Sequence, residues 1–360
     1  MQNNQAIPFN KENFKQILSK EFAWVIIVSI PGALIADYFN VPLAWFLGPM
    51  LVTSFATLGG LKTKMPRLVL STVLIFLGLY IGNYIDKNLF SQIHQWVWTS
   101  LIMLGYIIVS VLLVSKYLQK FSGYGEKTSI FSAAPGALGP LMILAEVEKS
   151  DLSQVATSHL IRLIIIITIF PFIVQTLQGT EGIEYGEELI ENQNIFELLI
   201  LVFLSIIFIL IFDKFKIPAA LLSGTLVASG ILQITDLASY KLPSNIIDYC
   251  LLILGASVGC RFADKTFDEI VKNALHSIVA TFFLVILGVL AAVIASLVIE
   301  KNFFTLLLSY CPGGIYEVAV IAIFFNLDPE FVSFHHIIRL LMILFFVPIL
   351  LKIISKKKPS

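Results

Sequence analysis

The chain is 360 residues long; 58% of its residues are hydrophobic and only 13% are charged. Soluble proteins carry about 25% charged residues, so this composition excludes an ordinary soluble protein, whose core could not hide so much apolar surface. The 24 Lys and Arg residues balance the 24 Asp and Glu residues, and the net charge therefore indicates no nucleic-acid partner.

Apolar runs follow one another along the chain. Runs such as "LIIIITIFPFIVQTL" and "LLILVFLSIIFILIF" have the length and low polarity of membrane-spanning helices. We therefore predict an all-α polytopic membrane protein. In chain order, the apolar segments are 22–38, 42–60, 67–86, 95–118, 128–147, 154–178, 195–212, 218–235, 245–263, 274–299, 303–326 and 331–354.

The acidic interval "QGTEGIEYGEELIENQN" divides two stretches of similar sequence. "IADYFNVPLAWFLGPML" matches "IFDKFKIPAALLSGTLV" at an offset of 176 residues, and later segments match at an offset of 177. So many coincidences indicate an internal duplication. The matched pairs include Asp37 and Asp213, Pro42 and Pro218, Gly78 and Gly255, Gly82 and Gly259, Pro135 and Pro312, Gly136 and Gly313, His159 and His336, and Arg162 and Arg339.

The duplication predicts the organisation of the chain. We expect a cytoplasmic N-terminal segment 1–21, a membrane repeat 22–178, an acidic extracytoplasmic linker 179–194, a second membrane repeat 195–355 and a basic cytoplasmic tail 356–360. The polar start "NKENFKQILSK" lacks the apolar core and cleavage site of a signal peptide. The first apolar segment is therefore expected to remain as a signal anchor.

One segment in each repeat has Pro and Gly at its centre: "SAAPGALGPLMILAE" and "SYCPGGIYEVAVIAI". Proline interrupts helical hydrogen bonds, so we predict a helix that is broken inside the membrane and either crosses it or re-enters. A half-helix beginning there points free N–H groups at the midplane, although a kink without a ligand stays an alternative. The candidate substrate-binding residues at these breaks are Ser132, Pro135, Gly136, Cys311, Pro312, Gly313 and Gly314.

The distribution of Lys and Arg predicts the topology. If the broken segments do not cross and the N-terminus is cytoplasmic, only Lys87, Lys241 and Lys301 lie outside, and the acidic linker faces out. Each repeat then crosses an odd number of times, so the repeats have opposite orientations. We predict an inverted-topology repeat with about 10 transmembrane helices and two broken or re-entrant segments.

"SHLIRL" and "HHIIRL" place His and Arg three residues apart on one face of the last helix in each repeat. Arg162 and Arg339 would lie ~16 Å deep, where a charge costs roughly 2.5–3.5 kcal/mol. Each arginine must therefore have a partner. Two roles stay open: binding an anionic substrate group, or binding carbonyl groups that the break leaves free.

Four residues are candidates for coupling to a proton or sodium ion: His159, Glu317, His335 and His336. Histidine titrates near neutral pH, although a packing role for these histidines stays open. Glu317 lies about one turn beyond the second break. The three cysteines form no CxxC pattern, so we expect no metal site and no cofactor.

Together with "VPLAWFLGPML", the broken segments and the His-x-x-Arg motifs resemble the AbrB family of bacterial inner-membrane proteins, over roughly residues 22–354. The resemblance implies an internal duplication and a location in the bacterial inner (cytoplasmic) membrane, where we expect both termini to be cytoplasmic. Members of this family carry labels of two kinds, ammonia monooxygenase and aidB regulator. The second repeat departs from the first with "CPGG" for "APGA" and with the additional His335, so the two breaks are not expected to be chemically equal.

The leading hypothesis is a secondary active transporter, not an enzyme, for a small anionic or carboxylate-bearing solute bound at the midplane between the two broken segments. One alternative is a membrane-embedded, metal-dependent oxidoreductase of the ammonia monooxygenase kind, which would need several converging ligands although the chain has 5 histidines and no HxH pattern. Another is an indirect membrane regulator of gene expression. The expected partners are the lipid bilayer, the solute and a coupling ion, H⁺ or Na⁺, and a homodimer stays open.

Overall fold

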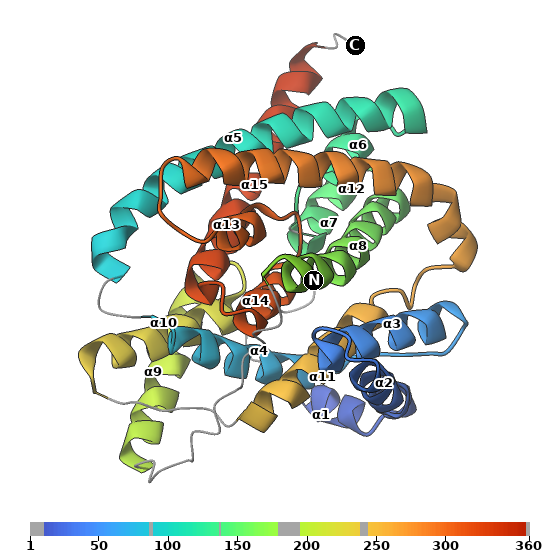
Figure 1. Ribbon diagram of the computed structural model, residues 1–360. Coiled ribbons are helices and arrows are strands. Elements are labelled where there is room, and N and C mark those ends of the chain that lie inside the picture. The colour runs from blue at the N-terminus through green and yellow to red at the C-terminus, as the bar shows by residue number, and fades with distance from the viewer. Residues whose placement is uncertain (1–10, 86–88, 137, 179–194, 238–243, 358–360) are drawn as a thin grey trace. The chain divides into compact units, whose positions relative to one another are not determined.

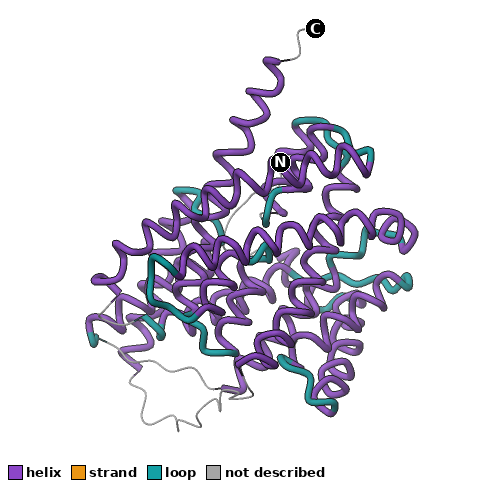
Figure 2. Tube along the Cα trace, turned by 45° about the horizontal axis from the view of Figure 1, so that its top comes forward, coloured by secondary structure: helices purple, strands orange, loops and turns teal. Residues whose placement is uncertain are grey.

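The chain is all-α in the part that the structure describes. This computed structural model describes residues 11–85, 89–136, 138–178, 195–237 and 244–357, and these residues form helices and no strands (Figures 1 and 2). The predicted fold class is confirmed at this level. The acidic linker 179–194 lies outside the described residues.

The helices coincide closely with the predicted apolar segments. Two begin earlier than expected, α5 at Leu89 and α12 at Phe267, because polar turns continue the apolar helix; the Thr266 side chain caps α12 by accepting a hydrogen bond from the Glu269 N–H (3.3 Å). The helices are α1 (Lys11–Ile17), α2 (Lys20–Tyr38), α3 (Ala44–Leu58), α4 (Arg67–Gly82), α5 (Leu89–Ser122), α6 (Glu126–Ala133), α7 (Leu138–Val147), α8 (Leu152–Gln178), α9 (Ile195–Lys214), α10 (Ala220–Thr235), α11 (Ser244–Cys260), α12 (Phe267–Ser296), α13 (Phe303–Tyr310), α14 (Ile315–Phe324) and α15 (Pro329–Lys357).

Six of the described helices are long and apolar enough to cross a membrane, and they indicate association with a lipid bilayer. They are Lys20–Tyr38, His94–Ser122, Leu152–Gln178, Phe196–Lys214, Phe267–Ser296 and Pro329–Ile353. The apolar helices α3, α4, α10 and α11 have 15, 16, 16 and 17 residues, fewer than the ~20 that a perpendicular span needs. The number of crossings therefore stays a prediction.

The described helices belong to two compact units, and each unit takes helices from both sequence repeats. Unit 1 comprises Met1–Phe90, Pro171–Lys265 and Ile323–Glu330, and unit 2 comprises Ser91–Phe170, Thr266–Ala322 and Phe331–Ser360. These units are defined by packing, whereas the predicted domains are defined by the sequence repeats. The predicted domain boundaries therefore stay a prediction. All candidate site residues lie in unit 2.

In unit 1, glycines let helices approach one another closely. α4 packs against α10 at Gly78, where a Cβ would overlap the Leu222 carbonyl oxygen. α11 packs against α3 at Gly255, where a Cβ would overlap the Phe46 carbonyl oxygen. Small residues permit such backbone contact between apolar helices. Because these positions correspond in the duplicated sequence, the duplication extends to the packing.

The duplication also extends to unusual backbone conformations. Leu43 and Ala219, which follow the paired prolines Pro42 and Pro218, have φ values of 54° and 55°. Non-glycine residues rarely adopt this left-handed conformation. Equivalent residues in the two repeats therefore adopt the same uncommon conformation before α3 and α10.

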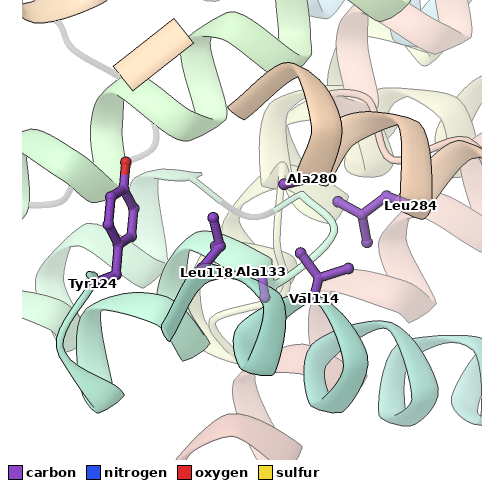
Figure 3. Close-up of a cluster of buried hydrophobic side chains, with 6 residues drawn as sticks. All are labelled: Val114, Leu118, Tyr124, Ala133, Ala280 and Leu284. Carbon is purple, nitrogen blue, oxygen red and sulfur yellow. The ribbon is translucent and has the colours of Figure 1, made fainter. Parts of the chain in front are cut away.

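The core of unit 2 includes the end of α6. Long helices α5 and α12 run side by side in Figure 1, and Figure 3 shows the buried side chains between them. Ala133, the last residue of α6, packs into this cluster. The end of α6 is therefore buried in a packed core. The cluster consists of Val114, Leu118, Tyr124, Ala133, Ala280 and Leu284.

Candidate functional site

Two helical segments of unit 2 are interrupted where the sequence places Pro and Gly. We call the residues between α6 and α7 break 1 (Ala134, Pro135, Gly136), and those between α13 and α14 break 2 (311–314). Ala134 and Cys311, directly before the prolines, have φ, ψ values of −61°, 128° and −58°, 131°. Such extended backbone is expected, because proline disfavours helical geometry in the preceding residue. Both predicted interruptions are therefore present, although whether they cross or re-enter stays a prediction.

Each proline leaves one helical carbonyl without its usual donor. In an α-helix, residue 135 would donate its N–H to the carbonyl of residue 131, and residue 312 to that of residue 308. Proline has no N–H to donate. His159 Nε2 instead donates to the Phe131 carbonyl (2.9 Å), and His336 Nε2 donates to the Leu308 carbonyl (2.9 Å). The carbonyl can only accept, so both rings must carry a proton on Nε2.

The arginines bind the next carbonyls. Arg162 donates from Nη1 to Ala134 O (2.6 Å) and from Nη2 to Ser132 O, in the last turn of α6 and at break 1. A cation at a helix C-terminus is favourable because the final carbonyls lack helical partners. Carbonyl binding is one of the two roles that the sequence analysis left open for this arginine. The substrate-binding role stays a prediction.

The second repeat has a related arrangement at break 2, in which one of the two carbonyl contacts, that to the residue before the proline, is equivalent. Arg339 donates from Nη1 to Cys311 O and from Nη2 to Gly313 O (2.6 Å). Nη2 also lies 3.1 Å from Nδ1 of His336. Because Nδ1 faces an N–H donor, it is the unprotonated nitrogen of that ring. Both ring nitrogens of His336 are therefore occupied by hydrogen bonds.

The two guanidinium groups lie in unit 2 as buried positive charges. Arg162 and Arg339 are each 2% exposed. Among the residues that the structure describes, no carboxylate is within ion-pair distance of either one. Burying a charge without an ionic partner is costly, so this arrangement favours an anion.

A contact between Arg339 and Gly136 brings the two breaks together. Gly136 has φ 99°, and a Cβ there would lie 2.8 Å from Arg339 Nη2. The guanidinium that binds break 2 therefore also lies against break 1. At break 2, a Cβ on Gly313 would lie 3.4 Å from the Ile166 side chain of α8. The two breaks are therefore in contact within unit 2 through Arg339 and Gly136, and the predicted substrate site between them stays a prediction.

Glu317 lies at break 2 rather than at break 1. It is 1% exposed in the first turn of α14, and its carboxylate is folded so close to Gly314 that a Cβ there would overlap Oε2. The structure therefore places this predicted coupling residue at the N-terminus of the second half-helix. Pro312 and Gly313 are buried beside it.

His335 lies in an aromatic cluster of α5, α13 and α15. Its Nδ1 donates to Phe331 O (2.9 Å), and its Nε2 lies 2.8 Å from the Thr99 hydroxyl. The rings of Trp96 and Tyr310 lie 6.3 and 6.4 Å from the imidazole. These contacts occupy both ring nitrogens, and the predicted coupling role of His335 stays a prediction.

Tyr106 is a site residue that sequence reasoning missed. Its side chain is 5% exposed on α5, its hydroxyl donates to Leu284 O (3.4 Å), and its ring lies 6.3 Å from that of Tyr310, the last residue before break 2. Phe283 occupies the equivalent position in the second repeat. Neither the duplication nor the hydropathy pattern therefore marked this position.

The first repeat has a polar cluster where the second has His335. The Tyr124 hydroxyl donates to Asn273 Oδ1 (3.1 Å), and the Ser158 and Ser277 hydroxyl groups are 3.3 Å apart. Ser158 is the sequence equivalent of His335. The predicted inequality of the two repeats therefore extends beyond the breaks themselves.

The described part of the chain offers no cluster of metal ligands. No three His, Cys, Asp or Glu side chains within it are grouped so that they could hold a metal ion. The histidines at the breaks instead donate to carbonyl groups. The oxidoreductase alternative is not tested by this arrangement and stays a prediction.

Comparison with known proteins gives the chain relatives over most of its length. The sequence profile of the family described as "Transition state regulatory protein AbrB" matches residues 2–84 and 45–355. An uncharacterized protein, YhjN, of Bacillus subtilis (strain 168) is 22% identical over 349 residues, which are 90% of this chain and 91% of the relative. A protein of Escherichia coli (strain K12) that is named as a regulator, AbrB, is 22% identical over 328 residues. These residues are 89% of this chain and 92% of the relative. No solved structure matches the chain.

Proposed function

We propose, since the chain belongs to the AbrB family and has helices that can cross a bilayer, that it is a secondary active transporter of a small anionic or carboxylate-bearing solute. The solute binds where break 1 and break 2 meet. On this proposal, the protein moves its substrate across the membrane without changing it chemically and is therefore not an enzyme.

The observation that carries the proposal is the pair of buried arginines. Arg162 and Arg339 are attached to the two breaks, and no described carboxylate pairs with either. Their hydrogen bonds to carbonyl groups orient the guanidinium groups but leave each positive charge in place. Guanidinium suits carboxylate in geometry and charge. An anionic solute would therefore be held by charges that the protein itself leaves unbalanced.

The proposed mechanism uses the internal duplication. The two repeats insert in opposite orientations, with about ten crossings in all, and the site lies near the midplane. In transporters of this architecture, the two repeats exchange conformations and so expose the site first to one side of the membrane and then to the other. The equivalent glycine contacts at Gly78 and Gly255 support two repeats of one structure.

The coupling ion is proposed to bind at break 2. Glu317 is buried in the first turn of α14, and a carboxylate in that setting suits a proton or a sodium ion. His159 and His336 donate to carbonyl groups, so their predicted part in coupling would require those hydrogen bonds to break. Glu317 is therefore the preferred coupling residue.

The proposed location is the inner (cytoplasmic) membrane of a bacterium, with both termini in the cytoplasm. The Lys and Arg distribution supports this orientation, because few of these residues fall on the outer side. The lipid bilayer, the solute and the coupling ion are the proposed partners. The structure describes one chain, and a homodimer stays open.

The regulatory names of the family and of the Escherichia coli relative favour a second candidate function. A membrane protein can alter gene expression indirectly, by changing the concentration of a metabolite that a separate regulator senses. Such a role would follow from transport. Solute flux by the purified protein would therefore support both, whereas a regulatory effect without any flux would favour the regulator alone.

Two measurements on purified protein test the transporter. First, the midpoint temperature of unfolding is measured with sodium salts of mono- and dicarboxylates and of amino acids, each against sodium chloride at equal ionic strength. A solute at 100 times its Kd should stabilise the folded state by about 2.7 kcal/mol. Second, the flux of a stabilising solute is measured in liposomes. Flux that is unchanged in both Arg162→Ala and Arg339→Ala would contradict the assigned site.

A further inference from the structure

We propose that break 1 is the subsite for the carboxylate of the solute, whereas break 2 holds the protein's own carboxylate, Glu317, in the corresponding place. This inference rests on the proposed anionic solute and goes beyond it, because it assigns the two equivalent breaks to different ligands. It is carried by differences between residues that the duplication makes equivalent.

The first difference lies in two buried serines. Ser132, in the last turn of α6, and Ser309, in the last turn of α13, are both fully buried. The Ser309 hydroxyl donates to Thr305 O (2.8 Å). The Ser132 hydroxyl has no hydrogen-bond partner among the described residues. A buried hydroxyl without a partner is unfavourable, so Ser132 supplies a donor that a bound ligand would satisfy.

The second observation concerns Arg162. Its two Nη atoms bind carbonyls of the first repeat, but its Nε–H has no hydrogen-bond partner within the described structure. The side chain is only 2% exposed, so solvent does not replace the missing acceptor. The same arginine therefore presents both a positive charge and an unused donor at break 1. A carboxylate oxygen would satisfy both.

The third difference lies at the start of the half-helices. The first turn of α14 contains Glu317, whose carboxylate folds against Gly314. The first turn of α7 contains no acidic residue, and Pro140 occupies the position equivalent to Glu317. A negative group is stabilised at a helix N-terminus. Break 2 thus already contains its negative group, and break 1 does not.

Charge from the second repeat also reaches break 1. The Arg339 guanidinium lies against Gly136, where a Cβ would be 2.8 Å from Nη2 and 3.2 Å from Cζ. A ligand at break 1 would therefore lie near both arginines. One negative charge there would interact favourably with both guanidinium groups.

The first turn of α7, which follows break 1 in the chain, is partly exposed. Gly139, in the first turn of α7, is exposed, and a Cβ built there meets no atom within 4 Å. Its equivalent in the second repeat is Tyr316, in the first turn of α14. A small solute could therefore approach α7 where a large side chain stands on α14. The ligand class that fits these features is a small carboxylate.

Charged thiol reagents test the assignment without knowledge of the solute. In full-length protein in detergent, with Cys250, Cys260 and Cys311 replaced by Ala, a single cysteine is introduced as Gly139→Cys or as Tyr316→Cys. Each is reacted with the anionic 2-sulfonatoethyl and the cationic 2-(trimethylammonium)ethyl methanethiosulfonate, and the rates are followed by intact-protein mass spectrometry. The ratio of the anionic to the cationic rate is the quantity compared, with N-acetylcysteine amide as a neutral reference thiol that needs no folding.

We expect the ratio at Gly139→Cys to exceed both the ratio at Tyr316→Cys and that of the reference thiol by about tenfold, because buried positive charge concentrates anions locally. Adding Glu317→Gln to Tyr316→Cys should raise the ratio at that position, since it removes the internal carboxylate. Equal ratios at the two positions, or no reaction of Gly139→Cys with either reagent, would overturn the assignment. The rate ratios are measured independently of solute flux. Equal ratios in a protein that transports a solute would refute only the subsite at break 1. A tenfold ratio in a protein that transports no solute would refute only the transporter.

Discussion

The guanidinium group of Arg339 lies against Gly136, so a side chain placed on this glycine would meet Nη2 at 2.8 Å. The two residues belong to different repeats, and each is attached to a different helix interruption. This contact joins break 1 to break 2. The sequence pattern paired equivalent residues of the two repeats and did not predict it. Both the positive φ of residue 136 and the neighbouring guanidinium group disfavour a side chain at this position.

Gly136→Ala should therefore destabilise the protein. The new Cβ requires a left-handed backbone at φ 99° and displaces Arg339 from its carbonyl partners, which together should lower the free energy of unfolding by about 1–3 kcal/mol. Thermal unfolding in detergent measures the change. Gly139→Ala is the matched control, because no atom lies within 4 Å of its Cβ, and it should leave the midpoint nearly unchanged. Equal midpoints for the two variants would show that Arg339 does not constrain Gly136.

His159 should contribute less to the free energy of unfolding when Pro135 is replaced. His159→Phe deprives the Phe131 carbonyl of its donor and should lower the free energy of unfolding by about 1–3 kcal/mol. In a Pro135→Ala background the backbone N–H of residue 135 is available to the same carbonyl. The cost of His159→Phe should then fall by about 1 kcal/mol, a coupling that a double-mutant cycle measures.

The second repeat provides a matched control for that cycle. His336→Phe and Pro312→Ala form the corresponding pair, since His336 donates to Leu308 O. This carbonyl also accepts from the Cys311 N–H (3.2 Å), so the coupling should be smaller than in the first repeat. His336 also accepts from Arg339, so its replacement should retain a larger cost in the proline-free background than that of His159. Additive effects in both repeats would contradict the view that these histidines replace the missing proline N–H.

Much of this architecture follows from local sequence, and the remainder does not. Hydropathy predicted the helical segments, and the Pro–Gly pairs predicted the interruptions, because both signals act within a few residues of chain. The Arg339–Gly136 contact depends on how distant segments pack. Tyr106 gave no signal, since its equivalent is Phe283 and it lies in an apolar run. Arg162 was assigned two open roles because sequence reveals a buried cation but not its acceptor.

The close contact between α4 and α10 should be intolerant of even one methyl group. Gly78→Ala places a Cβ against the Leu222 carbonyl oxygen, and the resulting strain should cost about 1–3 kcal/mol of unfolding free energy. Gly105→Ala, within α5, is the control, because nothing lies within 4 Å of its Cβ and alanine favours helix. We expect a lower unfolding midpoint for the first variant and an equal or higher one for the second. A midpoint for Gly78→Ala as high as that of the control would disprove the close packing.

The central claim is that buried arginine charge at the two breaks binds the solute that the protein transports. Its most direct test is the flux, in liposomes, of a carboxylate that stabilises the purified protein, compared between wild type and Arg339→Lys. Lysine keeps the charge but cannot bind both Cys311 and Gly313 carbonyls in the guanidinium geometry, so the flux should fall about tenfold or more while the protein stays folded. A folded Arg339→Lys protein that transports at the wild-type rate would contradict the account.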